Sequence, residues 1–146
     1  MDLLHRGATS ARIYRCPSEG GAAEALSSQN GSFPQEVLED LYFVTNLAGN
    51  PMLKKISRKK PVTETSVEGM PSVNFVNWAV FQDGIYFFPN LQWTLEYFDF
   101  ATKKVNPLMK MSEPVMGLSV SQERHSFVYA KLQQADSDIM VVEHWR

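Results

Sequence analysis

Apolar and polar residues alternate in short runs along this chain, and the runs come in pairs separated by turn residues. Alternation with a period of two is typical of β-strands whose two faces meet different surroundings. Paired runs recur three times, at residues 40–44 with 53–56, 84–88 with 95–100, and 126–129 with 138–142. A fourth, partial copy covers residues 11–15. The pattern predicts an all-β chain made from one repeated unit.

The copies are evenly spaced, with a period of about 42 to 44 residues. Tyr42 lies 44 positions before Tyr86, Leu53 lies 42 before Leu95, and Leu95 lies 44 before Ile139. A strand repeat of about 40 to 50 residues indicates a β-propeller, in which each repeat is one antiparallel four-stranded blade. A complete propeller needs about four to eight blades. This chain of 146 residues has strands for only about three, so we predict a partial, half propeller.

Turn-rich segments set the expected boundaries. We expect an N-terminal arm at residues 1–10 and a single partial propeller domain at residues 11–146. Residues 33–38 are ambiguous, because Pro34 weakens a strand and can also begin a helical turn; the repeat favours the strand. The predicted blades span about residues 11–30, 31–68, 72–112 and 115–146.

Three parts of the chain resemble TolB-like β-propellers, a family found in many bacterial proteins. Residues 117–121, 127–129 and 134–143 resemble the terminal blade of such propellers. Residues 77–87 with 98–102 resemble the preceding blade, and residues 13–15 with 19–21 resemble the third-strand turn of an earlier one. The resemblance covers nearly the whole chain from residue 11, and it implies the C-terminal blades of a propeller.

The chain departs from this family in its turns and its length. Family members usually carry Ser-Pro-Asp-Gly between the first two strands of a blade, whereas residues 121–124 read Ser-Gln-Glu-Arg and the middle blade keeps only Asp83 and Gly84. The family closes about six blades into a ring, and this chain supplies about half of them. A second copy would complete the ring as a homodimer. The alternative is a fragment whose missing half lies elsewhere.

Composition excludes some classes of partner. The formal net charge is −2 and the pI is about 5.9, so we expect no nucleic-acid binding. No apolar run reads as a signal peptide or a membrane span, so we expect a cytoplasmic protein without membrane contact. That expectation lapses if the chain is a piece of a larger protein. Cys16 is the only cysteine, which excludes a disulfide within the chain.

The residues that carry chemistry show no catalytic or metal-binding pattern. Ser119, Ser121 and Ser126 lie near His125, but the chain lacks the Gly-x-Ser-x-Gly elbow of many hydrolases. Its histidines (His5, His125 and His144) and Cys16 lack the close spacing of zinc ligands. Residues 136–138 (Asp-Ser-Asp) resemble the start of a calcium loop, yet capping of a turn explains them better. We therefore expect no enzyme activity, no cofactor and no metal.

Aromatic residues are the better interaction candidates. Trp93 follows a turn, where an exposed indole would be a binding hot spot. Trp78 is expected in the core, although a binding site in the channel would need polar groups around Trp78 and Asn77. Trp145 would seal a blade edge or a dimer seam.

Lysines and arginines form one basic cluster, which would meet an acidic partner or solvate a sheet edge: Lys54, Lys55, Arg58, Lys59 and Lys60, with Lys103 and Lys104 one blade away.

These observations predict a non-enzymatic interaction or scaffold module that completes a ring by self-association, or with another propeller-containing chain. Two alternatives remain open. One is an accessory or gating propeller of a larger enzyme such as a peptidase. A catalytic domain elsewhere in the parent gene would decide in favour of this alternative. The other is a propeller that binds a small ligand or a sugar in its channel.

Overall fold

The computed structural model describes residues 11–47, 49–59, 61–121 and 123–131, which contain twelve strands and no helix. Several predictions made from the sequence fall outside these ranges: the arm at residues 1–10, the strand at residues 138–142, the Asp-Ser-Asp segment, His5, His144 and Trp145. The strands are β1 (Tyr14–Arg15), β2 (Glu24–Ala25), β3 (Ser32–Val37), β4 (Asp40–Leu47), β5 (Asn50–Ser57), β6 (Thr63–Ser66), β7 (Val73–Val80), β8 (Gly84–Pro89), β9 (Thr94–Asp99), β10 (Val105–Lys110), β11 (Val115–Val120) and β12 (Phe127–Lys131).

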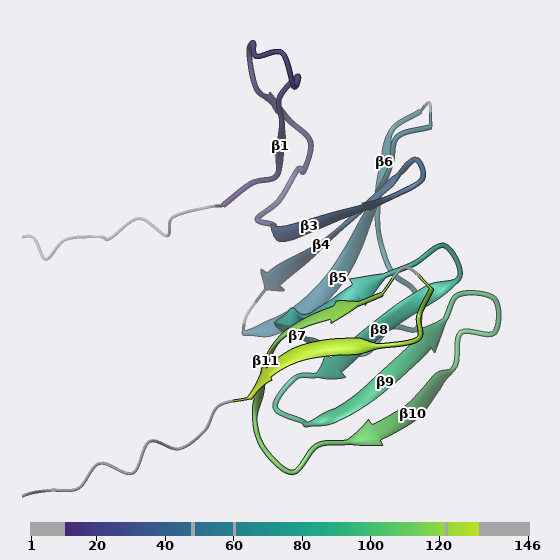
Figure 1. The fold of residues 1–146 in the computed structure, drawn as a ribbon. Helices are drawn as coiled ribbons and strands as arrows, with labels where there is room; N and C mark the ends of the chain where they lie inside the picture. Colours follow the sequence, from purple (N-terminus) through teal and green to yellow (C-terminus); the bar gives the residue numbers. More distant parts are fainter. Residues whose placement is uncertain (1–10, 48, 60, 122, 132–146) are drawn as a thin grey trace, which may run out of the picture.

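The strands form four antiparallel sheets (Figure 1). The first sheet contains β1 and β2, the second contains β3 to β6, the third contains β7 to β10, and the fourth contains β11 and β12. In the two four-stranded sheets the strands lie side by side in chain order. The predicted all-β class is confirmed, as is the strand at residues 33–38, and the sheets have a partial propeller-like arrangement. The described residues form no closed barrel.

Short turns with left-handed residues connect the strands within a sheet. Leu38, between β3 and β4, has a φ of 56°. Between β9 and β10, Asp99 Oδ1 accepts hydrogen bonds from the Thr102 backbone N–H at 2.7 Å and from its hydroxyl at 3.1 Å. The first of these bonds satisfies a backbone N–H where the chain reverses and the ladder ends, and the next residue, Lys103, has a φ of 58°.

The second sheet is buried on both faces, which its sequence pattern explains. Along β4, Tyr42 and Val44 pack toward the third sheet, whereas Leu41 and Phe43 pack toward the first. Successive side chains of a strand point to opposite faces, so a run without polar interruptions fills two cores. Full burial of one such side chain is worth about 1.5–3 kcal/mol.

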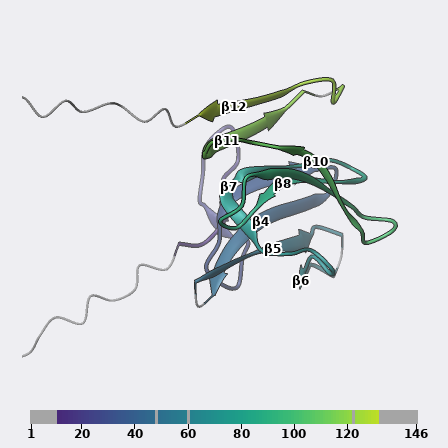
Figure 2. The ribbon, with the colours of Figure 1, turned by 90° about the horizontal axis from the view of Figure 1, so that it is seen from below.

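Three apolar cores therefore separate four stacked sheets, and the sheets follow one another in chain order. Figure 1 shows the first sheet beyond the second, and Figure 2 shows the second, third and fourth. The same position of the repeat supplies a buried residue to each core. Ile13 of the first sheet, Leu53 of the second and Leu95 of the third are 5%, 1% and 0% exposed, and each is buried against the next sheet in the stack. The first strand of each later sheet lies toward one side, where β7 contacts both β3 and β11.

Candidate functional site: a hollow between three strands

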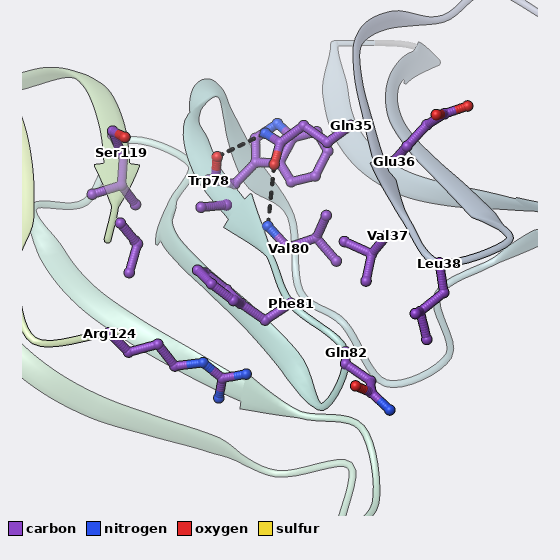
Figure 3. Close-up of a pocket in the computed structure, with 13 residues that line it drawn as sticks. Gln35, Glu36, Val37, Leu38, Trp78, Val80, Phe81, Gln82, Ser119 and Arg124 are labelled. Carbon is purple, nitrogen blue, oxygen red and sulfur yellow. Dashed lines mark hydrogen bonds between the residues drawn. The ribbon is translucent and has the colours of Figure 1, made fainter. Parts of the chain in front are cut away.

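A hollow of about 790 Å³ lies where β3, β7 and β11 converge (Figure 3). These are the first strands of the second, third and fourth sheets, so the hollow occupies the place that the channel has in a propeller. Its apolar lining includes Val37, Val80 and Phe81. Polar side chains also line it: Gln35, Glu36, Gln82, Ser119 and Arg124.

Gln35 joins the second sheet to the third across this hollow. Its Nε2 donates a hydrogen bond to the Trp78 carbonyl at 2.9 Å, and its Oε1 accepts one from the Val80 N–H at 3.1 Å (Figure 3). β7 is an edge strand of its sheet, so these backbone groups have no neighbouring strand to pair with. The carboxamide presents one donor and one acceptor, and it substitutes for a segment of that missing strand.

Arg124 joins the third sheet to the fourth at the mouth of the hollow. It lies in the turn between β11 and β12, where its φ is 60°. Its guanidinium binds both carboxylate oxygens of Asp83, in the turn between β7 and β8, at 2.6 and 2.7 Å. The same group lies 4.6 Å from the centre of the Phe81 ring. A bidentate ion pair combined with a cation–π contact fixes the orientation of the arginine.

The electrostatics of this pair favour the charged form of both partners. The hydrogen bond from Arg124 lowers the pKa of Asp83, and the same bond raises the pKa of Arg124. Burial, together with the Asp83 carboxylate, raises the pKa of Tyr97 to about 12. At neutral pH the carboxylate is therefore charged and the phenol is neutral, so the phenol can donate to the carboxylate.

An aromatic cluster supports the ion pair from the third sheet. Tyr86 lies at its centre, with ring centroids 4.7 Å from Tyr97, 5.4 Å from Phe127 and 5.6 Å from Phe81. Because Phe127 belongs to β12, the cluster crosses from the third sheet to the fourth. Edge-to-face ring pairs add about 0.5–1.5 kcal/mol each beyond their buried area.

Trp78 and Asn77, the residues around which a channel site would need polar groups, are both buried. Trp78 is 1% exposed and lies in the core between the second and third sheets, as predicted. Asn77 is also 1% exposed and does not line the hollow. Its Nδ2 donates to the Val115 carbonyl at 2.9 Å, while its Oδ1 is buried without a hydrogen-bond partner among the described residues. Asn77 thus links two sheets, and the polar lining comes from other residues.

Trp93 lies in the loop between β8 and β9 as predicted, but its indole is not an exposed anchor. The side chain is half-buried against the core of Phe88, Leu95 and Val115, between the third and fourth sheets. A large apolar ring at the end of a sheet shields from solvent those core residues that the turn does not cover. Its role in an interface stays a prediction.

The basic cluster is paired with acids around the second sheet. Lys54 binds Glu64 at 3.1 Å, and Lys55 binds Asp40 at 3.3 Å. The remaining described cations of the cluster bind acids near the β3–β4 turn: Arg58 with Glu36 at 3.1 Å, and Lys59 with Glu39 at 3.7 Å. These pairs neutralise the described cations from Lys54 to Lys59 locally. Lys54 and Lys55 belong to β5, which lies between β4 and β6, so the predicted role in solvating a sheet edge is wrong for these two residues.

The serine and histidine candidates build a turn. Ser121 Oγ accepts hydrogen bonds from the backbone N–H groups of His125 at 3.0 Å and Ser126 at 3.2 Å. His125 itself is exposed. The hydroxyl therefore holds the β11–β12 turn that carries Arg124 into the hollow.

Gln35, Arg124 and Asp83 are the site residues that the sequence did not single out as polar partners. Gln35 pairs with β7 over 43 and 45 positions of chain, and Arg124 pairs with Asp83 over 41. Each separation is about one repeat. A search for oppositely charged residues one period apart would have found Asp83 and Arg124, whereas Gln35 bonds to backbone groups of two apolar residues, which such a search does not detect.

Among the residues that the structure describes, no helix is long and apolar enough to cross a membrane, and no group of three or more His, Cys, Asp or Glu side chains is placed to hold a metal ion. In the comparisons with known proteins, no family model matches this chain, and no curated protein and no solved structure matches it either.

Proposed function

We propose that this chain is a non-enzymatic protein-interaction module that completes a propeller ring with a second copy of itself. The observation that carries the proposal is the outward face of the fourth sheet. That face points away from the third sheet, and it exposes residues at positions that the other sheets bury.

Equivalent positions of the repeat can be compared between the interior sheets and the fourth sheet. Tyr42 in β4 and Tyr86 in β8 both face the following sheet; Tyr42 is 6% exposed and Tyr86 is half-buried. Val128 in β12 follows Tyr86 by 42 positions and is 67% exposed. Met116, in the neighbouring strand, is 51% exposed. Sheets of a stack bury their faces against neighbours, so an end face of this kind marks an interface.

Two positions further along the same strands, the contrast repeats. Val44 and Phe88 are both 0% exposed, whereas Ala130 at the equivalent position of β12 is exposed. Its side chain is small, and it lies opposite Met116 in the ladder of β11 and β12. A partner sheet packed on this face would bury Met116, Val128 and Ala130 together, in the same way as the interior sheets bury each other.

Size-exclusion chromatography with light scattering, over a dilution series, tests the proposal. We expect a species of twice 16.6 kDa that dissociates only on strong dilution. A folded monomer at every concentration would overturn self-association. An unfolded or aggregating chain would also overturn it, in favour of a fragment that needs its missing sheets.

A second candidate function is binding of a small polar ligand in the central hollow. It is favoured by the exposed amide of Gln82 and the exposed hydroxyl of Ser119, which line the hollow beside the half-buried ring of Phe81. Aromatic faces beside amides and hydroxyls suit a neutral sugar. The test is a thermal-shift series with neutral disaccharides. We expect a stabilisation that the double change Gln82→Leu with Ser119→Ala removes, and no shift with any sugar would contradict binding.

A third candidate function is that of an accessory or gating propeller in a larger enzyme such as a peptidase. It would use the same hollow as a passage for substrate. A catalytic domain in the parent gene is the observation that would favour it.

A further inference from the structure

We propose that the ring closes through composite sheets, in which β11 and β12 of one copy join β1 and β2 of the other in a single four-stranded sheet. This inference rests on the proposed self-association and adds which strands meet and in what register. It concerns the two ends of the stack, where the described residues form two-stranded sheets.

The two short sheets are complementary halves of the same unit. In the second and third sheets the strands follow chain order, with β3 and β7 lining the hollow as first strands. β11 lines the same hollow, so the fourth sheet holds a first and a second strand. Ile13 in the extension of β1 is equivalent to Leu53 in β5 and Leu95 in β9, which are third-strand residues. The first sheet therefore holds a third and a fourth strand.

A hollow of about 430 Å³ lies where the first two strands of the first sheet would pack. Its apolar lining includes Ile13 and Leu26 on the side of the first sheet, and Pro34 and Leu41 on the side of the second. Charged side chains also line it: Arg15, Glu36 and Arg58. Ile13, Leu41 and half-buried Leu26 also belong to the core between these sheets. A pair of strands placed in this hollow would extend that existing core over β3 and β4.

The outward face of the fourth sheet fits this place. In the proposed assembly, Val128 and Ala130 of one copy would face the second sheet of the other copy. They would then occupy the positions that Tyr42 and Val44 occupy against the third sheet. Apolar side chains would meet the apolar part of this lining. The described residues place no strand on the outer edge of β12 or of β1. In the composite sheet these two edges pair, and β1 of the other copy takes the third-strand position that the repeat assigns to residues 138–142.

The repeat also fixes the register of the new strand pair. Tyr42 lies opposite Lys55 in the second sheet, and Tyr86 lies opposite Tyr97 in the third. Arg15 precedes Lys55 by 40 positions, and Val128 follows Tyr86 by 42. By this equivalence, Val128 of one copy lies directly opposite Arg15 of the other, and Ala130 lies opposite Ile13.

Two copies contain enough strands for a closed ring. Each copy contributes two four-stranded sheets and two half-sheets from its described residues. A two-fold axis that brings each half-sheet to its complement makes two composite sheets, so a pair of copies forms six four-stranded sheets. Six lies within the range of about four to eight blades at which propellers close.

Disulfide trapping tests this arrangement in the full chain. The variant combines Arg15→Cys and Val128→Cys with Cys16→Ser, so that the only two thiols lie at positions predicted to be opposite. Both native side chains are exposed in the single chain, so the changes leave its cores intact. Opposite residues of antiparallel strands have Cβ atoms about 4.5–5.5 Å apart, and small adjustments of the backbone allow a disulfide there. We expect a covalent dimer under mild oxidation.

The matched control keeps Arg15→Cys and Cys16→Ser but places the second thiol at Leu91, which is 84% exposed in the turn between β8 and β9. This control should remain without covalent dimer. A second measurement uses the single change Val128→Lys, which should raise the dimer dissociation constant at least about tenfold, because a positive charge would replace an apolar side chain at the contact, opposite Arg15 of the other copy. The corresponding Leu91→Lys change should leave the constant unaltered.

The outcomes separate the two proposals. If the wild-type chain is dimeric while the Arg15–Val128 pair gives no more covalent dimer than the Leu91 control, the composite sheets are wrong and self-association stands. A dimer insensitive to Val128→Lys has the same meaning. A disulfide formed within a monomer, through closure of the chain on itself, also overturns the composite sheets. A monomeric wild-type chain overturns both proposals.

Discussion

Asp83 and Arg124 are 41 positions apart and belong to turns of different sheets, yet they form a bidentate ion pair with oxygen–nitrogen distances of 2.6 and 2.7 Å. Phe81 lies under the same guanidinium, 4.6 Å from ring centre to guanidinium carbon. This cluster holds the fourth sheet over the third at the mouth of the hollow. It therefore offers a direct test of how tightly the end of the stack is attached.

Replacing Arg124 by Gln removes the ion pair and the cation–π contact together. The carboxylate of Asp83 is 57% exposed, so solvent screens the charge and limits the loss to about 0.5–1 kcal/mol. Urea unfolding followed by tryptophan fluorescence measures it. The control is Lys104→Gln, which also removes one positive charge but from an exposed turn. An Arg124→Gln chain as stable as this control would contradict a role in attaching the fourth sheet.

The same pair predicts a pH dependence. The pKa of Asp83 is lower in the folded chain than in the unfolded chain, so folding favours its ionised form. Its stabilising contribution is complete above the unfolded pKa of about 3.9 and is lost as pH falls through the lower folded value. The difference in stability between wild type and Asp83→Asn should therefore shrink as pH falls from 6 to about 2.5. Urea midpoints of both chains across this range provide the measurement, and a constant difference would rule the mechanism out.

Replacing Gln35 by Met tests the carboxamide that pairs with β7. The side chain keeps its length, but the Trp78 carbonyl and the Val80 N–H lose their partner. Each partly buried group left unpaired costs about 1–3 kcal/mol, reduced where water from the hollow can reach it. We expect a loss of about 1–3 kcal/mol in thermal or urea unfolding. Gln92→Met, the same change at an exposed site between β8 and β9, is the control. Equal stabilities of the two variants would show that the carboxamide does not join the sheets.

Replacing Asn77 by Asp places a carboxyl group in a site that is 1% exposed, beside the Val115 carbonyl. Burial disfavours the charged form, so the pKa of the introduced group should rise above its unfolded value. Its neutral form can donate a hydrogen bond to the carbonyl, whereas its charged form repels that oxygen. The variant should therefore lose stability as pH rises from about 4 to 7, by at least about 1–3 kcal/mol relative to wild type. Unfolding midpoints that are independent of pH would contradict the burial of this site.

Replacing Gly84 by Ala tests the tight entry into β8. A Cβ atom there would collide with the Phe98 carbonyl oxygen and with the ring of Tyr97. Backbone cannot move as freely as a flexible side chain, so overpacking should cost about 1–3 kcal/mol. Gln82→Ala, at an exposed site in the same turn, should be nearly neutral. The comparison uses thermal unfolding, and a Gly84→Ala chain as stable as Gln82→Ala would contradict the close approach.

The repeat was readable from the sequence because it rests on burial, which strand alternation reports directly. Tyr42 and Tyr86 stand one period apart and occupy equivalent positions in β4 and β8, and Trp78 lies in the core as its size suggested. The burial of Trp93 was harder to predict, because turn residues around it suggest exposure, whereas its ring packs against a core that includes Val115 of a later sheet.

The polar lining of the hollow was harder to predict. Gln35 reads as an ordinary polar residue of an edge strand, and its pairing with Trp78 and Val80 depends on how two sheets are stacked. Asn77 looked equally suitable for the channel, yet the register shift between Val73 and Trp78 turns it toward the fourth sheet. Side-chain direction after a bulge is not encoded by alternation alone.

The burial of β4 on both faces also restricts how the length of this chain can vary. A single residue inserted at the start of β4 would turn Tyr42 and Val44 to the face that Leu41 and Phe43 now occupy, and would turn Leu41 and Phe43 to the opposite face. The contents of two cores would be exchanged at once. An insertion in the exposed turn at Leu91 disturbs neither core. Length changes are therefore tolerated at turns or as the gain or loss of a whole sheet, whereas one extra residue inside an interior strand disrupts both of its neighbours.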